Sequence, residues 1–125
     1  MSIPGRIMEA WRRGGYELIG SPALLAEYER ALSYEHLRRR HLLSAEEIAR
    51  EVGSIRVAAT IVEPAEVPPV ITNDPTDDHV LACGVTGEAD IIVSGDRHLL
   101  ELREHRGIRV LSPRAFVALL DAEGL

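Results

Sequence analysis

The sequence contains a single cysteine, Cys83, and no lysine, so all 14 basic residues are arginines. One cysteine excludes an internal disulfide bond and favours a reducing compartment. No apolar run approaches the roughly 20 residues that a membrane-spanning helix requires. The segment from Met1 to Arg6 also lacks the apolar core of a signal peptide. Together these absences predict a cytoplasmic protein without a membrane anchor.

Several familiar catalytic patterns are also absent. The sequence has no phosphate-binding loop of the Walker type and no nucleophile-elbow glycines. Nothing near Cys83 supplies a base to activate a thiol, so we interpret this cysteine as a small core residue. The histidines show no zinc-ligand spacing and are interpreted as surface or packing residues. They are His36, His41, His79, His98 and His105.

The composition indicates one folded domain spanning residues 1–125, with 46% hydrophobic and 27% charged residues. No internal repeat, linker or low-complexity segment divides the chain. The net charge of −6 has the wrong sign for holding nucleic acid by bulk electrostatics. It does not exclude a nuclease, because an acidic metal site is itself negative until a cation binds.

The order of the predicted elements indicates an α/β fold. Helices are predicted over residues 4–13 and 97–104, and also from residues 22, 45, 75 and 113 onward. Strands are predicted over residues 16–20, 57–62, 90–93 and 108–111. These strands are too apolar for a sheet with one face in water, so we expect a parallel sheet covered by helices on both faces.

Two aspartates are the strongest candidates for chemistry. Asp77 falls in the first turn of a helix that Asp74 caps, and Asp96 directly follows a buried strand. In an open α/β sheet both positions face the crevice at the carboxyl ends of the strands. Two carboxylates there suggest Mg²⁺ shared with a phosphate, and therefore phosphodiester chemistry. Helix capping is the alternative interpretation of each aspartate, and the two roles are compatible because a capping carboxylate keeps a second oxygen.

A third acidic residue cannot be chosen from periodicity. Glu27 and Glu29 lie on opposite flanks of the apolar stripe of one predicted helix, and each by itself is typical of a solvated surface glutamate. Next to Asp96, Gly95 permits a tight turn, and the hydroxyl of Ser94 can hydrogen-bond a neighbouring carboxylate or a metal-bound water.

Taken together, these residues resemble the PIN-domain family, in particular VapC-like toxins of toxin–antitoxin pairs. The resemblance extends from Pro4 to about Leu120. It is carried by residues 4–11, 21–27, 74–82, 89–100 and 107–116. It implies a three-layer fold with a parallel sheet and helices on both faces. It also implies a ribonuclease dependent on Mg²⁺ or Mn²⁺, with RNA, a cognate antitoxin protein and a second copy of the chain as partners.

The resemblance also assigns roles to individual residues. Glu27, Asp77 and Asp96 fill the acidic positions that hold the metal and carry catalysis, and Ser94 supports them through its hydroxyl. It therefore chooses Glu27 over Glu29, and Asp77 over the aspartates beside it. The arginines of residues 38–40 are candidate RNA contacts, although each basic cluster is more typical of a solvated helix face. They are Arg38, Arg39 and Arg40.

The sequence departs from this family at its start. The family opens with a central strand that ends in an aspartate ligand, whereas this sequence opens with a predicted helix, on which Glu9 is badly placed to replace that ligand. We therefore expect weak or absent activity. We also expect unpaired edges at the strands of residues 16–20 and 90–93, and such edges recruit other chains. The alternative is a non-enzymatic PIN remnant that dimerises or binds an antitoxin. A receiver-like signalling domain is disfavoured because the chain has no lysine.

Overall fold

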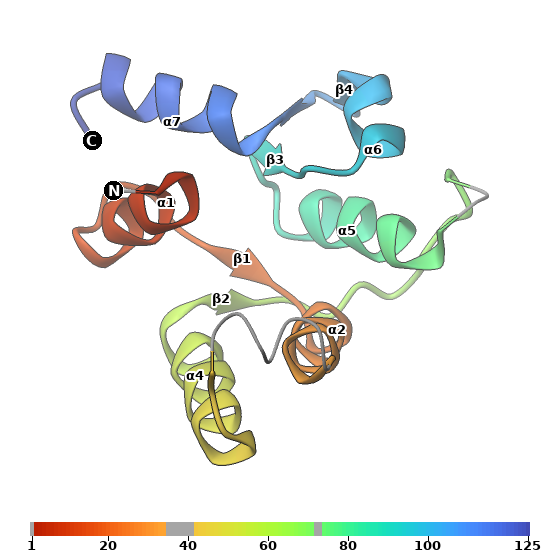
Figure 1. Ribbon diagram of the computed structural model, residues 1–125. Helices are drawn as coiled ribbons and strands as arrows, with labels where there is room; N and C mark the ends of the chain where they lie inside the picture. The colour runs from red at the N-terminus through yellow and green to blue at the C-terminus, as the bar shows by residue number, and fades with distance from the viewer. Residues whose placement is uncertain (1, 35–41, 72–73) are drawn as a thin grey trace.

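The computed structural model describes residues 2–34, 42–71 and 74–125 (Figure 1). The candidate RNA contacts Arg38, Arg39 and Arg40 lie outside these ranges. Along the chain the elements are α1 (Ile3–Arg12), β1 (Ile19–Gly20), α2 (Pro22–Ser33), α4 (Ala45–Ala58), β2 (Thr60–Ile61), α5 (Pro75–Thr86), β3 (Ile91–Val93), α6 (Arg97–Leu102), β4 (Glu104–His105), β5 (Ile108–Leu111) and α7 (Pro113–Ala122).

Capping side chains fix where the helices begin. The predicted capping box of α4 is present: Ser44 Oγ accepts from the Glu47 N–H at 3.1 Å, and the Glu47 carboxylate accepts from the Ser44 N–H at 3.2 Å. Serines or aspartates cap the other helices, and α1, α2, α5 and α7 each carry proline in the first turn. These local signals depend only on neighbouring residues, which is why the sequence predicts the starts well.

The prediction of a strand over residues 57–62 is wrong in its first part. Helix α4 continues to Ala58, and only Thr60 and Ile61 form strand β2. Val57 lies on this helix with 88% of its surface exposed. Extending a well-capped helix by one turn adds a hydrogen bond for each residue fixed, and this outweighs the preference of a single valine for a strand.

The chain also turns earlier than predicted after α6. The helix expected over residues 97–104 ends at Leu102, and β4 then pairs antiparallel with β5. Arg103, Arg106 and Gly107 have positive φ angles of 60°, 50° and 82°, which reverse the chain direction twice within a few residues. Strand β4 is therefore an antiparallel addition to the edge of a parallel sheet.

The main strand pairs are parallel, as the apolar composition of the strands predicts. Strand β1 pairs parallel with β2, and β3 pairs parallel with β5. The strands form two separate sheets, β1–β2 and β3–β5–β4, and α5 packs against β1 of the first and β3 of the second (Figure 1). Within the described residues no strand pairs with the second edge of β1 or of β3. The chain has the α/β, PIN-like fold that its sequence predicts.

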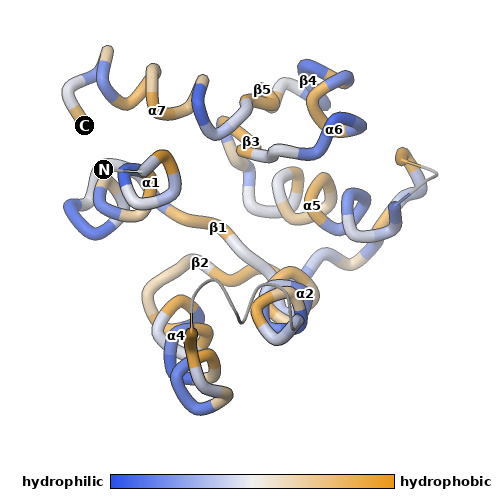
Figure 2. Tube along the Cα trace, in the orientation of Figure 1, coloured by the Kyte–Doolittle hydropathy of each residue, from blue (hydrophilic) through white to orange (hydrophobic). Residues whose placement is uncertain are grey.

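Three apolar clusters hold these elements together. The first packs α5 and α6 on β3 and β5, the second packs α1 on α7, and the third packs α2 on α4. In the second cluster the rings of Tyr16 and Phe116 meet edge to face at 5.2 Å. Figure 2 shows apolar residues alternating with polar ones along α1, α4 and α7, as expected for helices with one buried face. None of the described helices is both long and apolar enough to cross a membrane.

Candidate metal site

Asp77, Asp96 and His98 converge at one end of α5. Each offers a ligand atom, and the three atoms lie within 4.8 Å of one another. Asp77 comes from the first turn of α5, whereas Asp96 and His98 come from the start of α6, just after β3. Asp77 is only 4% exposed, and the other two residues are half-buried. The fold therefore brings together the two aspartates singled out from the sequence.

The helix cap leaves the Asp77 carboxylate available. Asp74 caps α5 by accepting a hydrogen bond from the Thr76 N–H at 2.9 Å. Asp77 donates its own N–H to the Asp74 carbonyl at 3.1 Å. Its side-chain Oδ2 is buried and has no hydrogen-bond partner among the described residues. A buried, unpartnered carboxylate oxygen is costly, and a bound cation would remove this cost.

Asp96 caps α6 and faces His98. Its Oδ1 accepts from the His98 N–H at 2.7 Å and lies 3.5 Å from His98 Nδ1. The Asp96 N–H donates to Ser94 Oγ at 3.0 Å, so Ser94 fixes the turn that presents the carboxylate. The capping role of Asp96 is thus confirmed, and the contacts with His98 use Oδ1 rather than Oδ2.

The electrostatics of the site favour a positive ligand. Burial raises the pKa of Asp77 to about 6, and the negative charges of Asp96 and Asp74 act in the same direction. The nearby His98 acts in the opposite direction. At neutral pH the Asp77 carboxylate is therefore ionised but poorly stabilised. The donor set of two carboxylates and one imidazole fits a divalent cation.

Glu27 lies outside this group. Helix α2, which carries Glu27, packs against α5, but its carboxylate does not join the three atoms of the site. Glu27 Oε2 instead accepts from Arg30 Nε at 3.2 Å and forms an ion pair with the terminal nitrogen of the same arginine. The structure thus leaves the ligand role of Glu27 as a prediction.

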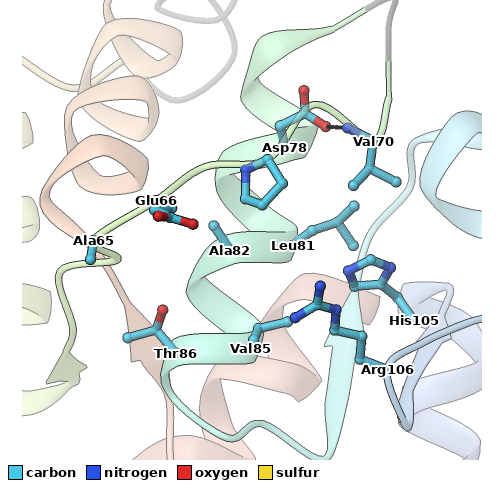
Figure 3. Close-up of a pocket in the computed structure, with 11 residues that line it drawn as sticks. Ala65, Glu66, Val70, Asp78, Leu81, Ala82, Val85, Thr86, His105 and Arg106 are labelled. Atoms are coloured by element: carbon cyan, nitrogen blue, oxygen red, sulfur yellow. Dashed lines mark hydrogen bonds between the residues drawn. The ribbon is translucent and has the colours of Figure 1, made fainter.

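Asp78 has a structural task, although it is adjacent to Asp77. Its buried Oδ1 accepts from the Val70 N–H at 2.9 Å and the Ile71 N–H at 2.7 Å, which fastens the preceding segment to α5. It borders a cavity of about 260 Å³ that His105 and Arg106 also line (Figure 3). None of the residues of the acidic site lines this cavity, so the two features are separate.

His98 is the site residue that the sequence analysis did not single out. Its spacing from the other histidines carries no signal of metal binding. A signal exists in its position two residues after Asp96, because the first turn of a helix that follows a buried strand faces the same crevice as the strand end. Recognising it requires knowing that Asp96 and Asp77 meet there.

The fold and the site together define an α/β protein with an acidic cluster at the carboxyl end of a parallel strand. A family model described as PIN domain matches residues 2–98, and the chain belongs to this family. PIN domains are nuclease-type domains that generally depend on divalent metal ions and act on RNA. Neither a search of curated proteins nor a search of solved structures gave a match.

Proposed function

We propose that this chain is a metal-dependent PIN endoribonuclease with Asp77 and Asp96 as its principal metal ligands and weak activity. The observation that supports this proposal best is the buried, unpartnered Oδ2 of Asp77, together with ligand atoms of Asp96 and His98 within 4.8 Å of the Asp77 ligand atom. If Asp77 had only a structural role, we would expect this oxygen to accept a hydrogen bond. An oxygen that binds a cation needs no hydrogen-bond donor.

The chain's own residues would then have distinct tasks. Asp77 and Asp96 would hold the ion, and Ser94 would orient Asp96 through the hydrogen bond to its N–H. His98 would complete the donor set beside Asp96. When bound, a divalent ion supplies positive charge to a scissile phosphate and lowers the pKa of a water molecule. Because imidazole suits transition ions better than Mg²⁺, we expect Mn²⁺ to bind at the lower concentration.

Glu27 is proposed as the third acidic ligand on the strength of the sequence resemblance. Its carboxylate is engaged by Arg30, whose side chain is 65% exposed. An exposed ion pair of this kind contributes about 0–1 kcal/mol. A cation can therefore compete with Arg30 at little cost.

The biological setting is proposed from the same resemblance. Residues 1–125 would form one domain that acts as the toxin of a toxin–antitoxin pair, with RNA as substrate and Arg38, Arg39 and Arg40 contacting it. An antitoxin protein and a second copy of the chain would be its protein partners. The competing proposal is a non-enzymatic PIN module that keeps these protein contacts without cleaving RNA.

Thermal unfolding and RNA cleavage test the proposal together. We expect Mn²⁺ to raise the Tm of the wild-type protein and of the control Asp90→Asn, which removes an exposed aspartate outside the site. Asp77→Asn and Asp96→Asn should abolish this rise. Slow cleavage of a mixed RNA pool should stop with EDTA or with Asp96→Asn. Cleavage that survives both treatments would contradict the proposed site.

A second pair of variants tests the third ligand. Glu27→Gln should lower the cleavage rate by at least about tenfold. This is the lower end of the loss of activity that follows when a side chain supporting a metal site is removed. Glu29→Gln on the same helix should leave the rate nearly unchanged. Equal effects of the two variants would contradict the assignment. Stabilisation by Mn²⁺ without any RNA cleavage would favour the non-enzymatic module.

A further inference from the structure

A cavity of about 590 Å³ separates the two sheets. The edges of β1 and β3 form two of its sides. Ile19 of β1 lines one side, and Ile91 and Val93 of β3 line the other. Helix α5 closes one face, and Ile7 of α1 and Phe116 of α7 lie on the other. We call this cavity the inter-sheet slot. It lies beyond the metal site, because none of the three site residues lines it.

Strand β1 runs antiparallel to α5. Ile19, where β1 begins, lies against Gly87 at the carboxyl end of α5, since a Cβ built on Gly87 would lie 2.6 Å from Ile19 Cγ2. The side chain of Ser21, just after β1, lies near that of Cys83, one helical turn earlier in α5. As β1 advances, it therefore moves toward the amino end of α5.

Strand β3 runs in the same direction. Just before it, Ala89 donates its N–H to the Gly84 carbonyl in the last turns of α5, at 2.9 Å. Just after it, Asp96 reaches Asp77 in the first turn of α5. Strands β1 and β3 are therefore parallel to each other, on either side of the inter-sheet slot.

The free edge of β1 presents backbone groups to the slot. The carbonyls of Leu18 and Gly20 accept hydrogen bonds from the β2 side, from the N–H groups of Thr60 at 2.8 Å and Val62 at 2.9 Å. In a parallel ladder, alternate residues bond to the same neighbouring strand. The N–H and carbonyl of Ile19 therefore face away from β2.

The free edge of β3 also presents backbone groups to the slot. The Asp90 carbonyl and the Ser94 N–H bond to β5, at 3.2 and 3.0 Å. By the same alternation, the backbone groups of Ile91 and Val93 face away from β5 and toward the slot. Within the part of the chain that the structure describes, two parallel edges with free donors and acceptors thus face one space, which is the arrangement on either side of a central strand.

The size and lining of the slot define the strand that fits. A residue of a strand in a stacked sheet occupies about 160 Å³, from its rise and the spacings between strands and sheets. The slot therefore accommodates about four residues. Val80 and Gly84 of α5 line one face and Phe116 the other, so both faces of such a strand would be apolar.

Charge fixes the direction of the strand. Glu17, Glu88 and Asp90 line the slot and lie just before β1 or β3, and none of the described residues that line it is basic. A strand parallel to both edges would place its amino end beside these acids. A basic residue just before the apolar segment would be complementary to them.

We propose that the inter-sheet slot binds an extended, apolar segment of another polypeptide, preceded by basic residues and running parallel to β1 and β3. The segment would join the two sheets into one by backbone hydrogen bonds to both edges. Its binding does not require the nuclease site, so metal-free protein can be used to test it.

The test uses a synthetic hexapeptide with two arginines followed by four alternating valines and leucines. We expect saturable binding by fluorescence anisotropy and a Tm that rises with peptide concentration. The same peptide methylated on two adjacent central nitrogens keeps its side chains but loses a donor toward each edge. It should bind at least about tenfold more weakly. Replacing the arginines by glutamates should weaken binding by at least about fivefold.

Variants of the protein test the edge itself. Val93→Pro removes the N–H that faces the slot and keeps the hydrogen bonds to β5, and proline is tolerated at an edge of this kind. It should weaken binding by at least about fivefold, whereas Val93→Ala, which keeps the N–H, should stay within about twofold. If Val93→Pro does not fold, the methylated peptide gives the same comparison on the wild-type protein. Equal binding of the two peptides, or no saturable binding, would overturn the proposal.

Discussion

Three aspartates at the start of α5 have three different tasks at the residue scale. Asp74 caps the helix, Asp78 fastens Val70 and Ile71, and Asp77 alone keeps a buried oxygen without a partner. Each is typical of the first turn of a helix, because the helix dipole favours acidic groups there. Their tasks differ because the surrounding segments offer backbone donors to the carboxylates of Asp74 and Asp78, whereas the carboxylate of Asp77 faces Asp96 and His98.

The raised pKa of Asp77 predicts a pH-dependent stability for the metal-free protein. The pKa of an unfolded aspartate is about 3.9, and that of Asp77 in the folded protein is about 6. The folded state therefore holds this proton more tightly. The free energy of unfolding should fall as the pH rises from about 4 to about 6, by up to about 3 kcal/mol for this group. Urea unfolding with EDTA across this range measures the change.

Asp77→Asn removes the titrating group. At pH 7 it should stabilise the metal-free protein by about 1–3 kcal/mol and flatten the fall between pH 4 and 6. The exposed control Asp90→Asn should follow the wild-type curve. If the free energy of unfolding of Asp77→Asn varied with pH in parallel with that of the wild type, the ionised Asp77 carboxylate would not be destabilising the fold. Stability gained at the expense of function is typical of active sites.

At the element scale, two helical glycines illustrate how packing decides the effect of the same change. Gly53 lies inside α4, where a Cβ would meet no atom within 4 Å. Gly87 ends α5, where a Cβ would lie 2.6 Å from Ile19 Cγ2. Gly53→Ala should therefore stabilise the protein by about 1 kcal/mol through helix propensity. Gly87→Ala should destabilise it by about 1–3 kcal/mol through overpacking.

Urea midpoints of the two glycine variants measure these effects, with the wild type as reference. Opposite signs are expected, because only one of the two sites has room for a methyl group. Shifts of the same sign would contradict the packing of β1 against α5, which also forms one side of the inter-sheet slot.

At the scale of the whole molecule, the separate apolar clusters predict uneven stability. The pair α2 and α4 has its own cluster, formed by Leu25, Ile48 and Val52. The two-residue strand β1 and the contact of α2 with α5 link this pair to the rest. Elements with separate cores and few links can open without global unfolding.

Native-state hydrogen exchange tests this expectation. Amides of α2 and α4 should exchange at least about tenfold faster than those of α5, β3 and β5, because they open at a lower free energy. The slot peptide should reduce this difference, since a strand paired with both β1 and β3 would couple the two sheets. Equal protection in all these elements would show that the chain unfolds as one unit.

The match between sequence and structure is closest where the determinants are local. The serine and aspartate caps and the prolines that follow them set the starts of the helices. The apolar strands indicate a parallel sheet covered on both faces. Each of these features depends on side chains a few residues apart, because a cap bonds its own first turn and a strand's composition reflects its own burial.

Only the tertiary structure decided which polar groups meet. It brought Asp96 and His98 to Asp77, about twenty residues earlier in the chain. It also divided the strands into two sheets with a slot between them. These outcomes depend on distances between segments that are remote along the chain. Such distances follow from how helices and strands pack, which no local pattern of residues specifies.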